Sequence, residues 1–263
     1  TGGEPLIRRG VDELFAGLGE LPGLETLALT TNGSQLAAQA SQLREAGVSS
    51  VNISLDSLDP TRFRTITRIG HLDAVMKGID AAIATGFKRI RLNAVILDGL
   101  NRDEALSLTR FAIDKNIHIA FIEEMPLGQV NVGGKALTYV SSDKLKTELE
   151  QHFELRALNS RANAGPSRDF RIAGTGTEVG FISPHSHNFC AQCNRLRVSA
   201  EGRLLMCLGN EQSIDLRDLL RAGRSDEDIK TTIMESLPIK PERHNFDRPE
   251  KPQIVRFMNA TGG

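Results

Sequence analysis

The sequence predicts an α/β protein with a parallel sheet of β–α units, open or closed into a barrel, followed by a smaller β-rich region. In the first half, short apolar segments rich in β-branched residues alternate with segments whose apolar residues recur at helical spacing, which is typical of β–α units. After Gly133-Gly134, short strands separated by glycines surround three cysteines. We therefore expect a barrel domain over residues 1–132 and a C-terminal domain over residues 133–263.

The first expected strand, 24–29, runs into the turn Thr30-Thr31-Asn32-Gly33. Ser34 is expected to cap the next helix, which Gly47 ends, and Asn101 with Glu104 reads as a capping box for a helix that runs to Lys115. The remaining barrel elements are expected as strands at 51–55, 90–97 and 117–123 and a helix at 72–85 that ends at Gly86.

The C-terminal region is expected to hold a helix over 142–152, short strands at 170–172 and 178–182, and a hairpin over 195–208 that turns at Glu201-Gly202. From Leu237 the chain is rich in proline and charge and shows no clear periodicity.

The composition is that of an ordinary globular protein, with 40% hydrophobic and 25% charged residues among 263. Lys plus Arg is 32 and Asp plus Glu is 33, giving a net charge of −1, so nucleic acid and anionic membranes are not expected as partners. No apolar run is long enough to span a bilayer, and the first residues do not resemble a signal peptide. The chain begins without Met at a Gly-Gly-Glu-Pro turn, and such a turn normally follows a strand.

The three cysteines are the strongest local signal in the sequence. Cys190 and Cys193 form a C-x-x-C pair, and Cys207 follows after 13 intervening residues. Clustered, odd-numbered cysteines argue for a metal site in a reducing compartment, so a cytoplasmic location is expected. Three thiolates leave one iron of a [4Fe–4S] cluster open, but structural zinc with His185 or His187 as fourth ligand fits the spacing as well, and a role without metal also stays open.

Other candidate residues lie beside the cysteines and at expected strand ends. Arg195 and Arg197 follow Cys193 at strand alternation and suit a polyphosphate, although they could equally be solvated. The turn at residues 1–5 offers backbone groups beside Gly3 and the Glu4 carboxylate. His118 reads as a core or rim residue rather than a ligand. Polar residues also gather where parallel strands end, as in a ligand-facing rim or in any turn: Thr30, Thr31, Asn32, Ser54, Asp56, Glu123, Glu124 and Met125.

Together these motifs resemble the GTP 3′,8-cyclases, a family of radical S-adenosylmethionine enzymes that act at the start of molybdenum cofactor biosynthesis. The resemblance spans essentially the whole chain. It rests on Thr-Gly-Gly-Glu-Pro-Leu at 1–6, Leu-Thr-Thr-Asn-Gly at 29–33, Asn-Ile-Ser-Leu-Asp at 52–56, Arg-Leu-Asn-Ala-Val at 91–95, Phe-Ile-Glu-Glu-Met-Pro at 121–126, Phe-Cys-Ala-Gln-Cys-Asn-Arg-Leu-Arg at 189–197, Met-Cys-Leu-Gly at 206–209 and the terminal Gly-Gly.

The resemblance implies a partial (βα)6 barrel closed by a β-rich C-terminal domain. It also implies a lyase that converts GTP to (8S)-3′,8-cyclo-7,8-dihydroguanosine 5′-triphosphate. One [4Fe–4S] cluster, in an N-terminal C-x-x-x-C-x-x-C segment, would cleave S-adenosylmethionine to a radical that takes hydrogen from the ribose C3′ of GTP. A second cluster, with an open iron, would hold the guanine. This makes a [4Fe–4S] cluster the expected occupant of the cysteine site.

The resemblance also implies roles for individual residues. Gly3, Glu4, Ser54 and Met125 match positions at the S-adenosylmethionine site. Cys190, Cys193 and Cys207 match the ligands of the C-terminal cluster, and Gly262 and Gly263 match a tail expected to enter the active site. Contacts to GTP are expected from Thr30, Arg91, Arg195, Leu196 and Arg197.

Two departures from the family accompany these matches. Arg91 stands where the family usually has Lys, which keeps the charge but changes the hydrogen-bond geometry. The C-x-x-x-C-x-x-C segment is absent from the given residues, so we expect them not to start the radical reaction on their own.

Three other functions fit part of the pattern. They are a zinc-stabilised barrel protein, another radical S-adenosylmethionine enzyme with an auxiliary cluster acting for instance on a peptide, and a binding module folded around one metal. For the family reading, the expected functional partner is the downstream cyclic pyranopterin monophosphate synthase, and a homodimer is possible.

Overall fold

The structure, a computed structural model, describes residues 3–125, 138–159 and 165–244. The chain divides into two compact units, which we describe separately. The barrel unit comprises Glu4–Glu124 and Asn131–Ser186, and the cysteine unit comprises Thr1–Gly3, Met125–Val130 and His187–Gly263.

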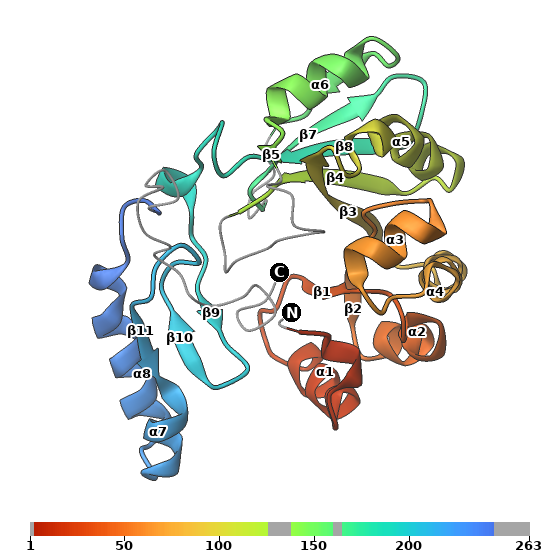
Figure 1. Cartoon of the computed structure of the whole chain (residues 1–263). Coiled ribbons are helices and arrows are strands. Elements are labelled where there is room, and N and C mark those ends of the chain that lie inside the picture. The colour runs from red at the N-terminus through yellow and green to blue at the C-terminus, as the bar shows by residue number, and fades with distance from the viewer. Residues whose placement is uncertain (1–2, 126–137, 160–164, 245–263) are drawn as a thin grey trace. The chain divides into compact units, whose positions relative to one another are not determined.

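A mixed sheet forms the centre of the barrel unit. Its strands follow the order β1-β2-β3-β4-β8-β7-β6, and the short β5 pairs antiparallel with β3 (Figure 1). The first five strands in this order are parallel, whereas β7 and β6 run antiparallel to their neighbours. The strands are β1 (Leu27–Thr31), β2 (Val48–Ser54), β3 (Arg89–Asp98), β4 (His118–Glu123), β5 (Thr138–Tyr139), β6 (Leu155–Ala157), β7 (Ser167–Ile172) and β8 (Glu178–Ile182). A curved sheet with five adjacent parallel strands confirms the α/β class and is consistent with the expected partial barrel.

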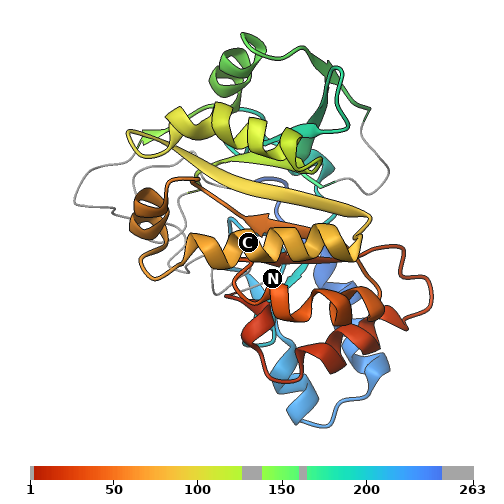
Figure 2. The same cartoon turned by 90° about the vertical axis from the view of Figure 1, so that its right-hand side faces the viewer.

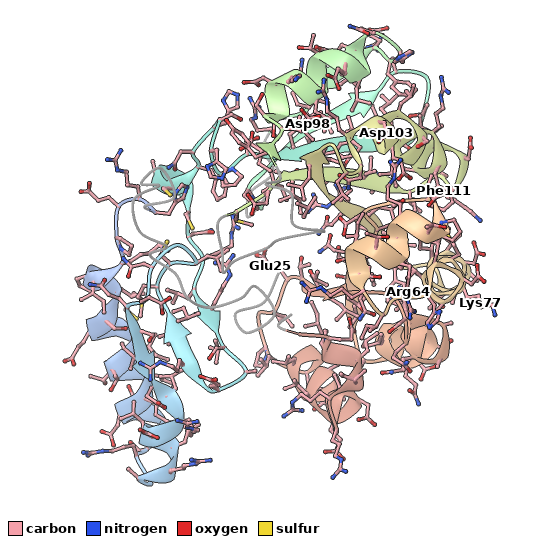
Figure 3. The ribbon with its side chains drawn as sticks, in the orientation of Figure 1. Glu25, Arg64, Lys77, Asp98, Asp103 and Phe111 are labelled. Atoms are coloured by element: carbon pink, nitrogen blue, oxygen red, sulfur yellow. The ribbon has the colours of Figure 1, made fainter. Side chains whose placement is uncertain are left out.

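Helices cover the convex side of this sheet, as the two views in Figures 1 and 2 show. Figure 3 places Arg64, Lys77 and Phe111 on helices of the convex side, whereas Glu25 lies on the concave side. None of the helices in the described part of the chain is long and apolar enough to cross a membrane. The helical elements are η1 (Pro5–Ile7), α1 (Val11–Gly19), α2 (Leu36–Glu45), α3 (Pro60–Thr67), α4 (Leu72–Thr85), η2 (Arg102–Glu104), α5 (Ala105–Asp114) and α6 (Ser142–Glu150).

The strands are amphipathic, and this places the core on one side of the sheet. In β3, Ile90, Leu92 and Ala94 are buried, while the alternating residues Arg91 and Asn93 are only half-buried. Because successive strand residues point to opposite faces, the apolar set packs under the helices and the polar set lines the concave face. The concave face is therefore the place to look for a ligand site.

The helix starts were less accurately predicted than the strands. Gln35, not Ser34, is the N-cap of α2, and no side chain caps it. The capping box of Asn101 and Glu104 is wrong. The Asn101 side chain accepts a hydrogen bond from the Leu97 N–H and donates to the Val95 and Asp56 carbonyls. Glu104 accepts from the Ser57 hydroxyl and the Leu58 N–H. The residue types of a capping box here serve contacts between distant segments.

The cysteine unit contains a three-stranded antiparallel sheet in the order β11-β10-β9. The predicted hairpin is confirmed, with Gly202 at a positive φ of 82° in its turn. The sequence analysis missed two helices, although Ser225 and Asp228 form a capping box at the start of the second. The elements are η3 (Cys190–Gln192), β9 (Arg197–Val198), β10 (Arg203–Leu205), β11 (Ser213–Asp215), α7 (Leu216–Arg221), α8 (Asp226–Ser236) and η4 (Leu237–Ile239).

The expected domain boundary after residue 132 lies outside the described residues. What the structure shows is that β6, β7 and β8 belong to the same sheet as β1–β4, because β8 pairs in parallel with β4. From His187 onwards the chain belongs to the cysteine unit.

Gly78 lets α4 approach the turn after β1. A Cβ built on Gly78 would lie 2.4 Å from the Gly33 carbonyl oxygen and 3.2 Å from Leu36 Cβ. We expect Gly78→Ala to lower the free energy of unfolding by about 1–3 kcal/mol through overpacking, despite the helix propensity of alanine. Gly17→Ala in α1 is the matched control, since nothing lies within 4 Å of the added Cβ, and it should stabilise by up to about 1 kcal/mol. Chemical denaturation measures both, and equal effects would contradict the packing argument.

Candidate functional site

A polar row crosses the concave face of the sheet. Thr30 of β1 pairs in register with Asn52 of β2, Asn52 with Arg91 of β3, and Arg91 with His118 of β4. Hydrogen bonds link the row, because Asn52 Nδ2 donates to Thr30 Oγ1 at 3.4 Å and Arg91 Nε donates to Asn52 Oδ1 at 3.3 Å. The structure thus brings together two expected GTP contacts, Thr30 and Arg91.

Arg91 is held in this row rather than left in solvent. Its side chain is 15% exposed, and its Nη1 lies 3.8 Å from Asp169 Oδ1 on β7. Burial, followed by repulsion from Arg89, lowers the pKa of the guanidinium despite the attraction of Asp169. Since arginine keeps its charge even then, Arg91 presents a poorly solvated cation to the concave side.

Beside Arg91 opens a cavity of about 1050 Å³. It lies at the amino-terminal ends of the first three strands, where β7 also begins. Lys88, Arg89, Arg91 and Arg168 line it, against the two carboxylates Glu25 and Asp169. A pocket of this volume accommodates a nucleotide-sized ligand, and the excess of cations favours an anionic one.

The cations of this cavity are partly neutralised from within the barrel. Arg89 forms a 2.6 Å ion pair with Glu178 and lies 3.6 Å from Asp169, and Arg171 pairs with the same glutamate at 2.7 Å. Glu178 is 1% exposed, and this buried carboxylate is paired with two arginines. Buried charges persist only when paired in this way.

His118 closes the polar row and is neutral at physiological pH. Its Nδ1 accepts a hydrogen bond of 3.1 Å from the Glu178 N–H. Burial, and next the positive charge of Arg89, lowers the pKa of the imidazole to about 4. The interpretation of His118 as a satisfied interior residue therefore agrees with its contacts.

A second row lies one step further towards the carboxyl ends of the strands. Ser54 pairs with Asn93, Asn93 with Ala120, and Ala120 with Gly180. Asn93 Oδ1 is buried and accepts no hydrogen bond from the described residues. Buried acceptors are normally satisfied, so this atom marks a place where a ligand donor would be stabilised. The sequence analysis quoted Asn93 within a motif but assigned it no role.

The glycine-rich turn before α1 is fixed to the end of β1 by Glu4. Its carboxylate accepts hydrogen bonds from Thr31 Oγ1 at 2.7 Å, the Asn32 N–H at 2.6 Å and the Leu6 N–H at 3.1 Å. Gly3, which precedes it, has a φ of 57° that favours glycine. The Glu4 carboxylate is thus occupied by hydrogen bonds that hold the turn in place. A ligand at this turn would therefore contact its backbone groups.

Two carboxyl groups organise the carboxyl edge of the sheet. Asp56 Oδ1 accepts from the Val95 N–H at 2.8 Å, and burial raises the pKa of this carboxyl to about 6. Glu123 is buried and accepts from the backbone N–H groups of Ser142, His185 and Ser186 and from the Ser186 hydroxyl. Burial alone would raise the pKa of Glu123, but these hydrogen bonds lower it. Glu123 thereby fixes the backbone just before Met125, which is half-buried.

In the cysteine unit, the three thiols are free and half-buried. The Cys193 N–H donates to the Cys190 carbonyl at 3.0 Å, which closes the turn of the C-x-x-C pair. Burial raises the pKa of Cys207, and the neighbouring Cys190 and Cys193 raise it further, although the Gly209 N–H and Lys240 act in the opposite sense. The other two thiols therefore lie close enough to act on the charge of Cys207. The described residues contain no group of three or more His, Cys, Asp or Glu placed to hold a single metal ion.

The expected GTP residues after Cys193 also lie in a charged setting. The Arg195 guanidinium lies over the Phe189 ring, 5.6 Å from its centroid. Burial, followed by repulsion from Arg195, lowers the pKa of Arg197. Leu196 between them is 37% exposed.

His185, one of the two histidines considered as a zinc ligand, belongs to the barrel unit. Its Nε2 lies 2.8 Å from the Glu124 carbonyl oxygen.

Some predicted residues cannot be joined to these sites. Gly262 and Gly263 lie outside the described residues, and Gly3 and Met125 fall in the cysteine unit rather than with Ser54. Conversely, the sequence analysis missed Lys88, Arg89 and Arg168. The basic run Lys88-Arg89 directly before a strand was a signal that could have identified two of them.

Comparison with known proteins decides the family. Residues 1–112 match the model of the Radical SAM superfamily, and residues 117–246 match that of Molybdenum Cofactor Synthesis C. A protein of Pseudomonas entomophila described as GTP 3′,8-cyclase is 52% identical over 265 residues, covering 100% of this chain and 79% of the relative. The chain belongs to the GTP 3′,8-cyclase family.

Further matches agree with this membership. The GTP 3′,8-cyclase of Saccharophagus degradans is 49% identical, over 100% of this chain and 80% of its own length. Among solved structures, SuiB of Streptococcus suis bound to S-adenosylmethionine aligns with a TM-score of 0.58 at 16% identity, over 98% of this chain and 64% of that one. This likeness shows the fold alone, and it supports the radical S-adenosylmethionine barrel expected for a GTP 3′,8-cyclase.

The low pKa of His118 makes stability depend on pH. Between about pH 6.5 and 4, the unfolded imidazole binds a proton that the folded one does not, so stability falls as the pH is lowered. His118→Asn keeps an acceptor for the Glu178 N–H but does not titrate. We expect wild type to lose on the order of 1–2 kcal/mol more than the variant between pH 7.5 and pH 5, a value reduced from the full pKa shift because the ring is only half-buried. Urea denaturation at both pH values measures this difference, and parallel losses in the two proteins would refute it.

Proposed function

We propose that this protein converts GTP to the 3′,8-cyclised dihydroguanosine triphosphate in the first step of molybdenum cofactor biosynthesis, using S-adenosylmethionine and a [4Fe–4S] cluster. Family membership supports the reaction class. The single structural observation that carries the substrate assignment is the cavity beside Arg91, because four cations against two carboxylates suit a triphosphate. Its product would be consumed by cyclic pyranopterin monophosphate synthase, and a cytoplasmic location and a homodimer stay predictions.

In this proposal, the polar row and the cavity bind the phosphates of GTP. Arg91, Arg89 and Lys88 line one side of the cavity, and Arg168 adds a fourth cation. Arginine offers planar, paired donors to phosphate oxygens, which a single ammonium cannot match. A bound triphosphate would replace Asp169 as the counter-charge of Arg91, since a 3.8 Å contact is a loose ion pair. Thr30 and Asn52 would then orient the nucleotide beside Arg91.

The second row and the glycine turn suit S-adenosylmethionine. Asn93 Oδ1 is a buried acceptor without a described donor, and a hydroxyl or amino group of the cofactor would satisfy it. Ser54 is its partner in register. Gly3, Glu4 and Met125 are proposed for the same cofactor from the family motifs alone. The unsatisfied Asn93 atom supports the place of Ser54.

Cys190, Cys193 and Cys207 would hold the C-terminal [4Fe–4S] cluster. The fit rests on the turn that the Cys193 N–H closes onto the Cys190 carbonyl and on donors close to two of the sulfurs. When bound, such a cluster with three protein thiolates supplies one open iron for a substrate nitrogen or oxygen. Arg195 and Arg197 would provide positive charge for the nucleotide phosphates, with Leu196 between them. The tail, Gly262 and Gly263, is proposed to enter the active site.

We expect Cys193→Ser and Cys207→Ser each to abolish the [4Fe–4S] cluster. Iron and sulfide are measured after anaerobic reconstitution, with Val198→Ser as control because Val198 is 59% exposed in the same small sheet. The control should retain full iron and sulfide. Stoichiometric zinc without sulfide in the wild-type protein would overturn the cluster assignment.

We expect Arg91→Gln, Arg195→Ala and Arg197→Ala to weaken binding of GTP far more than binding of guanosine. A hydrogen bond to a charged group contributes about 1.5–3 kcal/mol, so each variant should lose roughly tenfold to hundredfold in GTP affinity. Titration calorimetry measures the two affinities. Arg156→Ala is the control, since its side chain is 68% exposed and pairs with Glu154 at 2.8 Å. Equal losses for nucleotide and nucleoside would show that these arginines do not read the phosphates.

A further inference from the structure

Lys240 links the two segments that carry Cys193 and Cys207. This half-buried lysine follows η4, and its Nζ donates hydrogen bonds of 2.8 Å to both the Arg195 and the Met206 carbonyl oxygens. Arg195 lies two residues after Cys193, and Met206 directly precedes Cys207. A single ammonium group therefore fixes the backbone next to two of the three cysteines.

The same ammonium group also lies beside a thiol. Lys240 Nζ is 3.8 Å from Cys193 Sγ, within hydrogen-bonding distance of a sulfur acceptor. The cationic Lys240 thus lies next to the Cys193 sulfur, and a nearby cation favours the thiolate, which is the form that binds iron.

A second donor from the same part of the chain reaches another thiol. The N–H of His244, a residue that is 4% exposed, donates to Cys190 Sγ at 3.4 Å. His244 Nε2 in turn lies 3.3 Å from Asn188 Nδ2, and Asn188 Oδ1 accepts from the Cys190 N–H at 2.8 Å. The segment 240–244 thereby supplies donors to Cys190 and Cys193 alike.

We propose that Lys240 is a positioning residue of the C-terminal cluster, whose positive charge raises the reduction potential of that cluster. The inference rests on the proposed function, because it requires a [4Fe–4S] cluster on the three cysteines. Reduction adds negative charge to a cluster, so a nearby cation and N–H donors to its sulfurs stabilise the reduced state. Because Lys240 does not bind iron, it acts through Cys193 and the two carbonyls.

The alternative is that Lys240 only ties two backbone segments together. Three substitutions separate charge from hydrogen bonding. Lys240→Arg keeps the charge, Lys240→Gln keeps amide donors without the charge, and Lys240→Met removes both. A charge role places wild type and Lys240→Arg at similar potentials and the two neutral variants lower. A role limited to the carbonyls gives all cluster-containing variants the same potential.

The experiment is a redox titration of the anaerobically reconstituted protein, followed by electron paramagnetic resonance. The signal of this cluster is assigned as the one that Cys207→Ser removes. In Lys240→Gln we expect the ratio of reduced to oxidised cluster at a fixed potential to fall on the order of tenfold, which is about 59 mV for one electron. Lys230→Gln is the matched control, because it removes a cation of the same unit whose side chain is 70% exposed, and it should leave the potential unchanged.

Each outcome bears on a different claim. Absence of iron and sulfide from the wild-type protein would overturn the proposed cluster and this inference with it. A wild-type cluster whose potential is the same in Lys240→Gln and Lys230→Gln would overturn the inference alone. Should Lys240→Gln bind no iron, Lys240→Arg decides: a cluster with the wild-type potential supports the role of charge, and loss of the cluster in Lys240→Arg as well contradicts it.

Discussion

Charged side chains on the concave face of the barrel unit must neutralise one another, because burial removes the water that would otherwise solvate them. Glu178 illustrates the constraint, since this buried carboxylate pairs with Arg89 and Arg171 while its backbone N–H donates to His118 Nδ1. Asp169 extends the network to Arg91. The concave face of the strands is therefore polar, and the alternating apolar residues face the helix-covered side.

The same constraint shapes the close packing of β7 against β8. A Cβ on Gly180 would lie 2.2 Å from Ser167 Oγ and 2.4 Å from Asp169 Oδ1. Glycine at this position leaves room for the Asp169 carboxylate, to which Ser167 Oγ donates at 2.5 Å. The counter-charge of Arg91 thus depends on a residue that contributes no side chain. In the cysteine unit, cations and N–H donors instead surround groups that carry negative charge as thiolates.

The sequence could predict whatever depends on local pattern. Period-two alternation identified the central strands, and Gly86 ended α4 as expected because it takes up a positive φ of 73°. The Asn101 and Glu104 pair was misread because the same residue types satisfy either a helix start or a distant strand edge. The spacing of Cys190 and Cys193 pointed to a metal site. Lys240 gave no such signal, since only tertiary folding brings it to Cys193.

Lys240 and Cys193 are separated by 47 positions in the sequence, so their contact closes a long loop that contains the small sheet together with α7 and α8. Closing such a loop costs chain entropy, and a charged partner at the thiol offsets part of that cost. By thermodynamic linkage, a group that strengthens the negative charge on the sulfurs also strengthens the closure, and the closure strengthens binding of that group to the same degree. Binding of such a group at the cysteines and the contact of Lys240 with Cys193 are therefore coupled.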